Sequence, residues 1–384
     1  MELKTLTYRE AGGWSEPIPR EMDSDRTLVL IFAGAKYGQD STVLVELVAG
    51  FPESVISGCS TFGEIMGREI HEDSIVAAIV KFRKTRLVSA SALINLASES
   101  FSAGADLARQ LRAPDLKGVL ILSDGQNVNG SELVRGLNSL VPKEVVVTGG
   151  LAGSTPSIPS WVIHNRIPRS LYVTAVGFYG QAIHISHGCK GGWDIFGPER
   201  QVTRSEGNVL YELDGKPALI LYKEYLGNLA ALLPKSALLF PLSLRRSSHD
   251  TKIVVRSVLA VDEKNGSMAF GGDIPKGFLA QLMRANLERL ITAAADSAGM
   301  TRAANPGPAL AVVISCMGRR VVLGERAEEE IEAGLDALPP GVVQMGFYSH
   351  GEISPVRLSV ASEFHNQTVT YTTFSEDTNF SENG

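Results

Sequence analysis

The sequence predicts an α/β fold of layered mixed sheets, built as two modules from repeated units of strand, helix, strand, loop and hairpin. Three observations lead to this prediction. Continuous apolar runs typical of buried strands begin at residues 27, 118 and 309. Each run is followed by residues at helical spacing and then by a second strand. Each second strand enters a short loop that contains glycine, so one order of elements recurs three times.

The first unit is predicted from strand patterns and from helix start and stop signals. Asp40 and Ser41 offer a helix cap, and Gly50 and Pro52 end the helical pattern. The basic turn 83–86 separates two apolar runs, which predicts that they form a β-hairpin. The predicted elements are a strand, a helix, a strand, a glycine loop and the hairpin, over residues 27–32, 43–48, 54–57, 58–65 and 74–93.

The second and third units repeat this order. The second has a strand, a helix, a strand, a glycine loop and a hairpin over residues 118–124, 131–140, 144–148, 149–154 and 171–186. The third has a strand, a helix, a strand and a loop over residues 309–316, 327–338, 342–345 and 346–355. The unequal distances between the units argue against a tandem solenoid.

The long segment between the second and third units contains further elements. We expect a short element of unassigned type at 202–204, a strand at 253–261, a helix at 218–226 and a long amphipathic helix at 275–298. Gly215, Lys216 and Pro217 punctuate the chain and indicate a domain boundary. The predicted parts are an N-terminal extension, two domains and a C-terminal tail, at residues 1–26, 27–216, 217–374 and 375–384.

Two of the loops carry the same chemical groups. When Gly58 is aligned with Gly346, Thr61 falls on Ser349 and the triplet 63–65 falls on 351–353, without a gap. The two aligned triplets both read Gly-Glu-Ile. Loops that carry hydroxyl and carboxyl groups often form binding sites. We therefore expect Glu64 and Glu352 to face one shared pocket for a small ligand.

Composition excludes several classes of protein. The formal net charge of −6 argues against a dedicated nucleic-acid binder, which needs a concentrated basic surface. No apolar run approaches the length of about 20 residues that spans a bilayer, and no signal peptide is recognisable. Three cysteines in no Cys-x-x-Cys arrangement fit a reducing compartment. These features predict a cytoplasmic protein.

Several of these motifs, taken in order, resemble the FIST-domain sensory proteins. The similarity spans roughly residues 27–374 and rests on five segments, at residues 58–65, 202–208, 240–242, 346–355 and 365–368. The resemblance implies a FIST N module followed by a FIST C module. It implies a non-catalytic sensor of bacterial signal transduction, which binds a small molecule and signals through a separate partner.

The resemblance also extends to a haem-binding, nitric-oxide-sensing branch of that family. It implies haem as cofactor and a histidine kinase or other signalling protein as partner, with a homodimer as an open option. His350 would be the axial ligand, because gas sensors commonly bind haem iron through a neutral imidazole. Glu352 would then orient the imidazole. The plain alternative is a loop histidine bonded to backbone, and a sensor of amino acids without haem is the alternative function.

Candidate ligand-binding residues come from the paired loops and from two arginines that could neutralise a carboxylate or a haem propionate. They are Cys59, Ser60, Thr61, Glu64, Arg204, Arg256, Tyr348, Ser349 and Glu352. A less favoured interpretation makes Cys59 a catalytic nucleophile at a strand end. The second and third units carry Gly150 and Phe347 at that position, which favours a buried, apolar role for Cys59.

Overall fold

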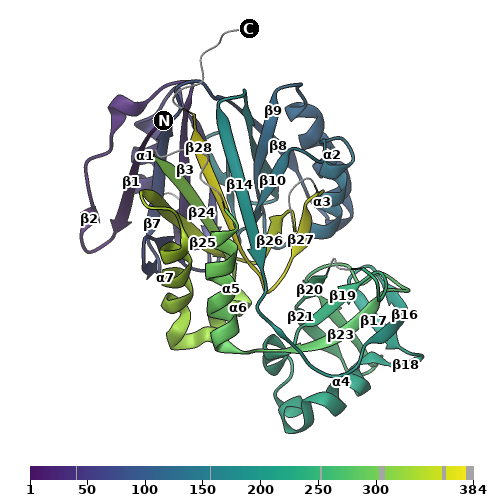
Figure 1. Ribbon diagram of the computed structural model, residues 1–384. Coiled ribbons are helices and arrows are strands. Elements are labelled where there is room, and N and C mark those ends of the chain that lie inside the picture. Colours follow the sequence, from purple (N-terminus) through teal and green to yellow (C-terminus); the bar gives the residue numbers. More distant parts are fainter. Residues whose placement is uncertain (40, 156, 251–252, 302–307, 357–359, 378–384) are drawn as a thin grey trace.

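The chain folds into two bodies joined by two adjacent connections (Figure 1). The computed structural model describes residues 1–39, 41–155, 157–250, 253–301, 308–356 and 360–377. The larger body holds three mixed sheets with helices on their outer faces, and the smaller body holds a fourth, antiparallel sheet. The predicted α/β class with mixed sheets is confirmed.

Each sheet of the larger body is built on the same three strands. A parallel pair is linked by helix, and a third strand returns antiparallel to the first of the pair. The first unit has β3 (Thr27–Gly34), α1 (Thr42–Ala49), β4 (Val55–Thr61) and β7 (Ile75–Lys81). The second has β9 (Leu116–Ser123), α3 (Gly130–Asn138), β10 (Val146–Leu151) and β13 (Tyr172–Tyr179). The third has β24 (Ala309–Cys316), α6 (Met317–Leu323), α7 (Ala327–Ala337), β25 (Val342–Ser349) and β28 (Val369–Glu376).

The three units are therefore structural repeats, as the sequence pattern predicts. Strand register gives the equivalence directly, because Cys59 lies opposite Phe32, Gly150 opposite Leu122, and Phe347 opposite Ile314. Side chains from all three sheets meet in one central apolar core, which includes Phe32, Leu122, Ile314, Phe347, Phe178 and Phe374.

The hairpin that follows each loop joins the sheet of a different unit. The hairpin of the first unit, β5 (Glu64–Met66) and β6 (Glu69–His71), pairs with β25. The hairpin of the third, β26 (Gly351–Ser354) and β27 (Glu363–His365), pairs with β10. The hairpin of the second, β11 (Val162–His164) and β12 (Ile167–Arg169), pairs with β4. This cyclic exchange ties the three units into a single body.

The hairpins predicted at 74–93 and 171–186 are wrong. β7 pairs within the first sheet, whereas β8 (Arg86–Leu93) pairs with β13 in the second. Likewise, β14 (Ile183–Lys190) leaves β13 and pairs with β28. Glu376 explains the first crossing, because its carboxylate accepts the backbone N–H groups of residues 83–85 at 2.7, 2.7 and 2.8 Å. The turn is thus held to the third sheet rather than closing a hairpin.

The predicted N-terminal extension is part of the first sheet. β1 (Glu2–Arg9) pairs with β7, and β2 (Gly13–Trp14) pairs with β1. At the other end, β28 runs through Ser375 and Glu376, so these two residues belong to the sheet and not to a tail. Residues 378–384 and Asp40 lie outside the described residues. Ser41 caps α1, since its hydroxyl accepts the N–H of Leu44 at 3.1 Å.

Helices cover the outer faces of the three sheets. α1 packs on the first sheet, α2 (Ser100–Leu111) and α3 on the second, and α5 (Leu287–Gly299) and α7 on the third. Short 3-10 turns link the elements at Arg20–Met22, Ala35–Gly38, Ala97–Glu99, Gly227–Leu232, Lys235–Leu239 and Gly324–Arg326. Among the described residues, no helix is long and apolar enough to cross a membrane.

The smaller body lies between β14 and α5 in the chain. Its strands are β15 (Asp194–Ile195), β16 (Arg200–Glu206), β17 (Val209–Leu213), β18 (Lys216–Pro217), β19 (Leu242–Arg245), β20 (Val254–Arg256), β21 (Val258–Asp262), β22 (Ser267–Phe270) and β23 (Leu279–Arg284). Helix α4 (Ala218–Leu226) packs on them, as predicted. Because β17 pairs with β18 and β22, residue 217 falls inside this sheet and not between the two bodies.

The long helix predicted at 275–298 is wrong in its first half. Residues 279–284 form β23, which pairs with β19 and buries Ala280 and Leu282 in the core of the smaller body. The helix begins only after Asn286, whose side chain accepts the N–H of Arg289 at 3.3 Å. Apolar residues recur through the strand and on into the helix, so the sequence pattern alone does not show where the helix begins.

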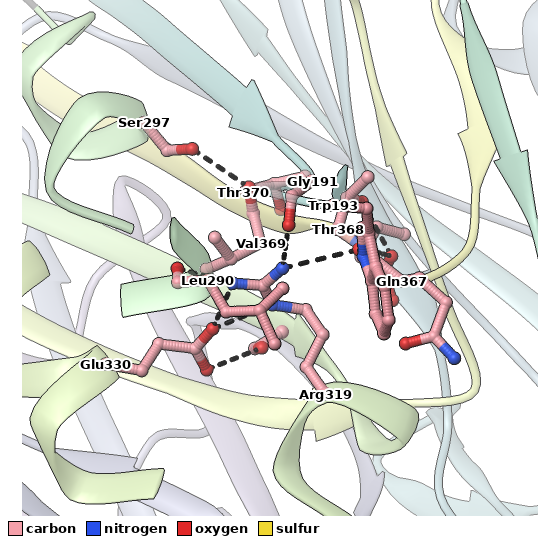
Figure 2. A network of polar contacts seen from close by, with 12 residues as sticks. Gly191, Trp193, Leu290, Ser297, Arg319, Glu330, Gln367, Thr368, Val369 and Thr370 are labelled. Atoms are coloured by element: carbon pink, nitrogen blue, oxygen red, sulfur yellow. Dashed lines mark hydrogen bonds and ion pairs between the residues drawn. The ribbon is translucent and has the colours of Figure 1, made fainter. Parts of the chain in front are cut away.

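A buried ion pair holds both connections to the smaller body (Figure 2). Arg319 and Glu330 are fully buried and lie 2.6 Å apart, and Ser315 donates to the same carboxylate at 2.9 Å. The Arg319 guanidinium also donates to the carbonyls of Gly191, Leu290 and Gln367. Gly191 begins the outgoing connection, and Leu290 lies in α5 after the return. Arg319 thus fixes where the smaller body is attached.

Replacing Arg319 by methionine is expected to lower the free energy of unfolding by about 3–5 kcal/mol, because Glu330 is left buried without a partner. Chemical denaturation measures this change. The matched control is Arg326→Met, which removes the exposed ion pairs to Glu288 and Glu329 and should cost less than about 1 kcal/mol. Equal losses of unfolding free energy in the two variants would contradict the anchoring role of Arg319.

Candidate functional site

The three glycine loops converge at one end of the larger body. Phe62 donates its N–H to the Tyr348 carbonyl at 3.0 Å, and Tyr348 returns a bond of 3.0 Å to the Gly63 carbonyl. The loop of the second unit joins through the Leu151 carbonyl, which accepts the N–H of His350 at 3.1 Å. The loops therefore meet through direct backbone hydrogen bonds, and neither Glu64 nor Glu352 lines any of the main cavities formed by the described residues.

Glu64 is a buried structural carboxylate. Its residue surface is 0% exposed. Thr61 donates a short hydrogen bond to one carboxyl oxygen. Ser74 donates to the other through its N–H at 3.0 Å and its hydroxyl at 2.6 Å. All of these donors come from the first unit, so the carboxylate joins the loop to the start of the return strand β7.

Glu352 repeats this arrangement in the third unit. It is also 0% exposed. Ser349 donates to one oxygen at 2.8 Å, and Thr368 donates to the other through its N–H at 3.2 Å and its hydroxyl at 2.7 Å. Thr368 precedes β28 as Ser74 precedes β7. The prediction that the two glutamates face a common ligand pocket is therefore corrected, since each is enclosed by hydroxyl and amide groups of its own unit.

In the second unit a different residue supplies the carboxylate that binds the start of the return strand. Glu64 pairs with Phe347, and Glu352 pairs with Gly150. At the equivalent position of the second unit, Val162 pairs with Cys59. In place of the missing glutamate, Asp124 at the end of β9 accepts the Leu171 N–H at 2.6 Å. A carboxylate thus ties the start of the return strand in every unit.

The remaining predicted loop residues also have structural roles. Cys59 is fully buried in the central core, and burial raises the pKa of its thiol well above the usual value, which disfavours a thiolate nucleophile. The Ser60 hydroxyl donates to the Gly153 carbonyl at 2.6 Å and accepts the Trp161 N–H at 2.9 Å. Tyr348 is fully buried against α7 and does not line the cavity between the two bodies.

His350 has surroundings that do not fit a haem group. Its ring packs edge to face on Phe62 at 4.4 Å, and its other neighbour is Gly125, where an added Cβ would lie 2.6 Å from the imidazole. His350 is an exposed residue whose Nε2 atom lies 3.4 Å from the Ser154 hydroxyl, so its imidazole is not set in an enclosed apolar pocket of the kind that holds haem. Glu352 does not orient the imidazole, because its oxygens bind Ser349 and Thr368. Among the described residues, no three His, Cys, Asp or Glu side chains could hold a metal ion together.

The two predicted arginines lie in different places. Arg204 is an exposed residue of β16, with its guanidinium over the Tyr211 ring at 4.4 Å and 3.4 Å from Glu212. It contributes to no described cavity. Arg256, in contrast, is 4% exposed and lies where the two bodies meet. It donates to the Phe364 carbonyl at 2.9 Å and lines a cavity of about 320 Å³ between the bodies.

This cavity combines residues from both bodies and is the strongest candidate for a ligand site. The larger body contributes α3 and β27, and the smaller body contributes β19, β20 and the segment 273–278. Its volume lies in the range of small-molecule sites. Sequence reasoning selected Arg256 but missed Ser131, Arg246, Asp273 and Phe364, because no local pattern places these distant segments together.

Comparison with protein families agrees with the predicted resemblance. Residues 27–216 match the FIST N domain, and residues 218–355 match the FIST C domain. The predicted family is thereby confirmed, whereas these matches give no support to a haem-binding or nitric-oxide-sensing branch. No curated protein matches the chain.

The two buried glutamates should make stability depend on pH. Burial raises the pKa of Glu64 and of Glu352 from 4.5 to about 7. A carboxyl with a raised native pKa stabilises the fold below its unfolded pKa, and this contribution is lost as pH rises towards 7. The loss is on the order of 3 kcal/mol for each group.

Urea denaturation at pH 5 and pH 8 tests this expectation. The double variant Glu64→Gln with Glu352→Gln should lose less stability between these pH values than the wild type, because an amide does not ionise. The exposed control Glu53→Gln should retain the wild-type dependence. An unchanged pH dependence in the double variant would refute the role given to these carboxyls.

Proposed function

The chain belongs to the family of FIST-domain proteins, and on that premise we propose that it is a non-catalytic sensor that binds a small molecule between its two bodies. FIST domains are generally associated with signal transduction and the sensing of small ligands. The cavity lined by both bodies is the single observation that carries this proposal. A partner protein would respond to the change in position of the smaller body that the ligand causes. We propose that both proteins lie in the cytoplasm.

The attachment of the smaller body suits a ligand-dependent change of position. Two adjacent connections attach it to the larger body. They lie side by side because β15, where the chain enters the smaller body, pairs with β23, where the chain leaves it. An apolar cluster that includes Val255, Met283, Leu290 and Leu323 joins the bodies, and polar contacts cross the cavity beside it. Asn129 donates to Asp273 at 2.9 Å, and Arg256 donates to Phe364. A ligand that touches both bodies would favour the arrangement in which they are closest.

Signalling requires the ligand to bind one arrangement better than another, because only a difference in affinity shifts a population. A molecule in this cavity meets that condition when it bridges α3 and the smaller sheet. The converging loops do not, because their backbone bonds and buried carboxylates fix them in one geometry. The cavity is therefore the better position for the sensor's input.

The finer hypotheses from the resemblance have less support. Haem-based sensing of nitric oxide with a partner histidine kinase rests on the resemblance alone, and the exposed position of His350, packed on Phe62, does not support it. Sensing of amino acids without haem stays a prediction that the cavity can accommodate. Catalysis by Cys59 is disfavoured because the thiol is sealed in the central core.

A distance measurement tests the proposal. All three native cysteines are buried, so labels can be placed selectively at Ser102→Cys on α2 and Lys264→Cys in the smaller body, both of which are exposed. A ligand identified by thermal shift from a metabolite panel should shorten the distance between the labels, because it bridges the bodies. A ligand that binds with no change in this distance would contradict the sensor mechanism.

Haem addition gives a second test. Because His350 is exposed and packs on Phe62 rather than lining an enclosed apolar pocket, His350→Ala should leave the absorption spectrum of the haem-treated protein unchanged. The control His249→Ala removes an exposed histidine of the smaller body. Stoichiometric haem binding that disappears only in His350→Ala would restore the haem hypothesis.

A further inference from the structure

We propose that the cavity between the two bodies binds a small organic anion, with a carboxylate or phosphate group on Arg256 and an apolar body against the adjoining walls. This inference rests on the proposed function for its biological meaning. It rests on the geometry around Arg256 for its chemistry.

Arg256 is a buried cation without an anionic partner among the described residues. Its Nε atom donates to the Asp273 carbonyl at 3.2 Å, and Nη1 donates to the Val255 and Phe364 carbonyls at 3.1 and 2.9 Å. Nη2 has a single long contact, 3.4 Å to the Ser131 hydroxyl. A guanidinium carries two N–H donors on Nη2, so this edge retains donor capacity on the side of the cavity.

An unpaired buried charge is costly, and proteins normally pair or neutralise it. Burial lowers the pKa of Arg256 to about 10, because the opposing charges of Glu363 and Asp273 do not cancel the cost of burying the guanidinium. The contrast with Arg319 is direct, because that buried arginine has its own carboxylate in Glu330. An anion from outside the chain would supply what Arg256 lacks.

A second guanidinium strengthens the preference for an anion. Arg246 lines the same cavity, is exposed, and has no ion pair or hydrogen bond among the described residues. Arg135 and Arg245 are already paired, with Glu132 at 2.5 Å and with Glu199 at 2.6 Å. The cavity thus offers two cations that form no direct ion pair with a carboxylate among the described residues.

The acidic residues of the cavity do not offset these cations fully. Glu132 is held by Arg135, and Asp273 accepts the Asn129 amide. Asp250 and Glu363 have interactions of their own. None of the four forms an ion pair with Arg246 or Arg256 in the part of the chain that the structure describes, so binding of an anion has to break no existing pair of these arginines.

The remaining lining is apolar and defines the rest of the ligand. Val134, Leu244, Val254, Phe278 and Phe364 provide aliphatic and aromatic surface. A cavity of about 320 Å³ accommodates a ring or a short chain together with a charged group. Arginine binds carboxylate and phosphate alike, through paired N–H donors. The shared chemistry is therefore an anionic oxygen group on a small apolar frame.

Calorimetric titration with simple probes tests this proposal. Benzoate and phenyl phosphate carry the two candidate groups on the same ring, and benzamide is the neutral counterpart of benzoate. At least one anion should bind at least tenfold more tightly than benzamide, and its affinity should fall with rising salt. The stronger of the two anions identifies the source of the charge as carboxylate or phosphate.

Variants separate the binding role of Arg256 from its role in folding. Arg256→Lys keeps the charge but lacks the Nη2 donors, and it should weaken binding of the anion at least tenfold. Arg246→Gln changes an exposed, unpaired residue and should weaken binding severalfold while the melting temperature stays unchanged. The control Arg204→Gln alters an exposed arginine of the same body outside the cavity and should bind as the wild type does.

Three results would overturn the inference: neither anion binds, benzamide binds as well as benzoate, or Arg256→Lys and Arg246→Gln both bind with wild-type affinity. The labelled protein distinguishes this failure from failure of the proposed function. Anion binding without movement of the bodies removes the sensor mechanism and leaves the ligand class intact. Movement caused only by neutral or cationic molecules supports the sensor mechanism and refutes the proposed ligand class.

Discussion

The exchange of hairpins between the three units is the constraint on which the rest of the structure depends. Each loop must cross from its own sheet to a neighbouring one, so that Glu64 lies opposite Phe347 and Glu352 opposite Gly150. A crossing of this kind buries backbone and side-chain polar groups, which must then be satisfied internally. Buried carboxylates with paired hydroxyl donors meet this need in the first and third units, and Asp124 meets it in the second. The shared groups of the loops are thus explained by assembly rather than by ligand binding.

Because the three sheets are locked together, the freedom for a functional movement lies in the smaller body. Its two connections leave the larger body side by side, and the buried pair of Arg319 and Glu330 anchors both of them. Beyond this anchor the bodies meet through an apolar cluster, which includes Val255, Met283, Leu290 and Leu323, and through polar contacts around a cavity. Arg256 crosses that boundary as a cation with only carbonyl and hydroxyl partners. A rigid support, a narrow attachment and a buried cation that forms no ion pair among the described residues together define the proposed input site.

The sequence predicted the repeated units well, because a buried parallel pair and its helix leave strong periodic patterns. It could not predict strand partners, since the short turn at residues 83–85 is equally compatible with a hairpin and with a crossing to another sheet. The glutamates illustrate a second limit. A Gly-Glu-Ile loop reads the same whether its carboxylate is open or enclosed, and the enclosing groups, Ser74 and Thr368, lie 10 and 16 residues away. Arg256 was selected for its charge alone, and only the fold brings Arg246 and Phe364 beside it.

The central claim is that the cavity between the bodies receives the ligand while the converging loops are structural. Hydrogen exchange with and without benzoate or phenyl phosphate tests it most directly, since it reports protection segment by segment. The account predicts slower exchange on ligand addition in α3, in β20 and at residues 273–278, with no change in the loops 58–65 and 346–353. Protection confined to those loops, with none around Arg256, would contradict it.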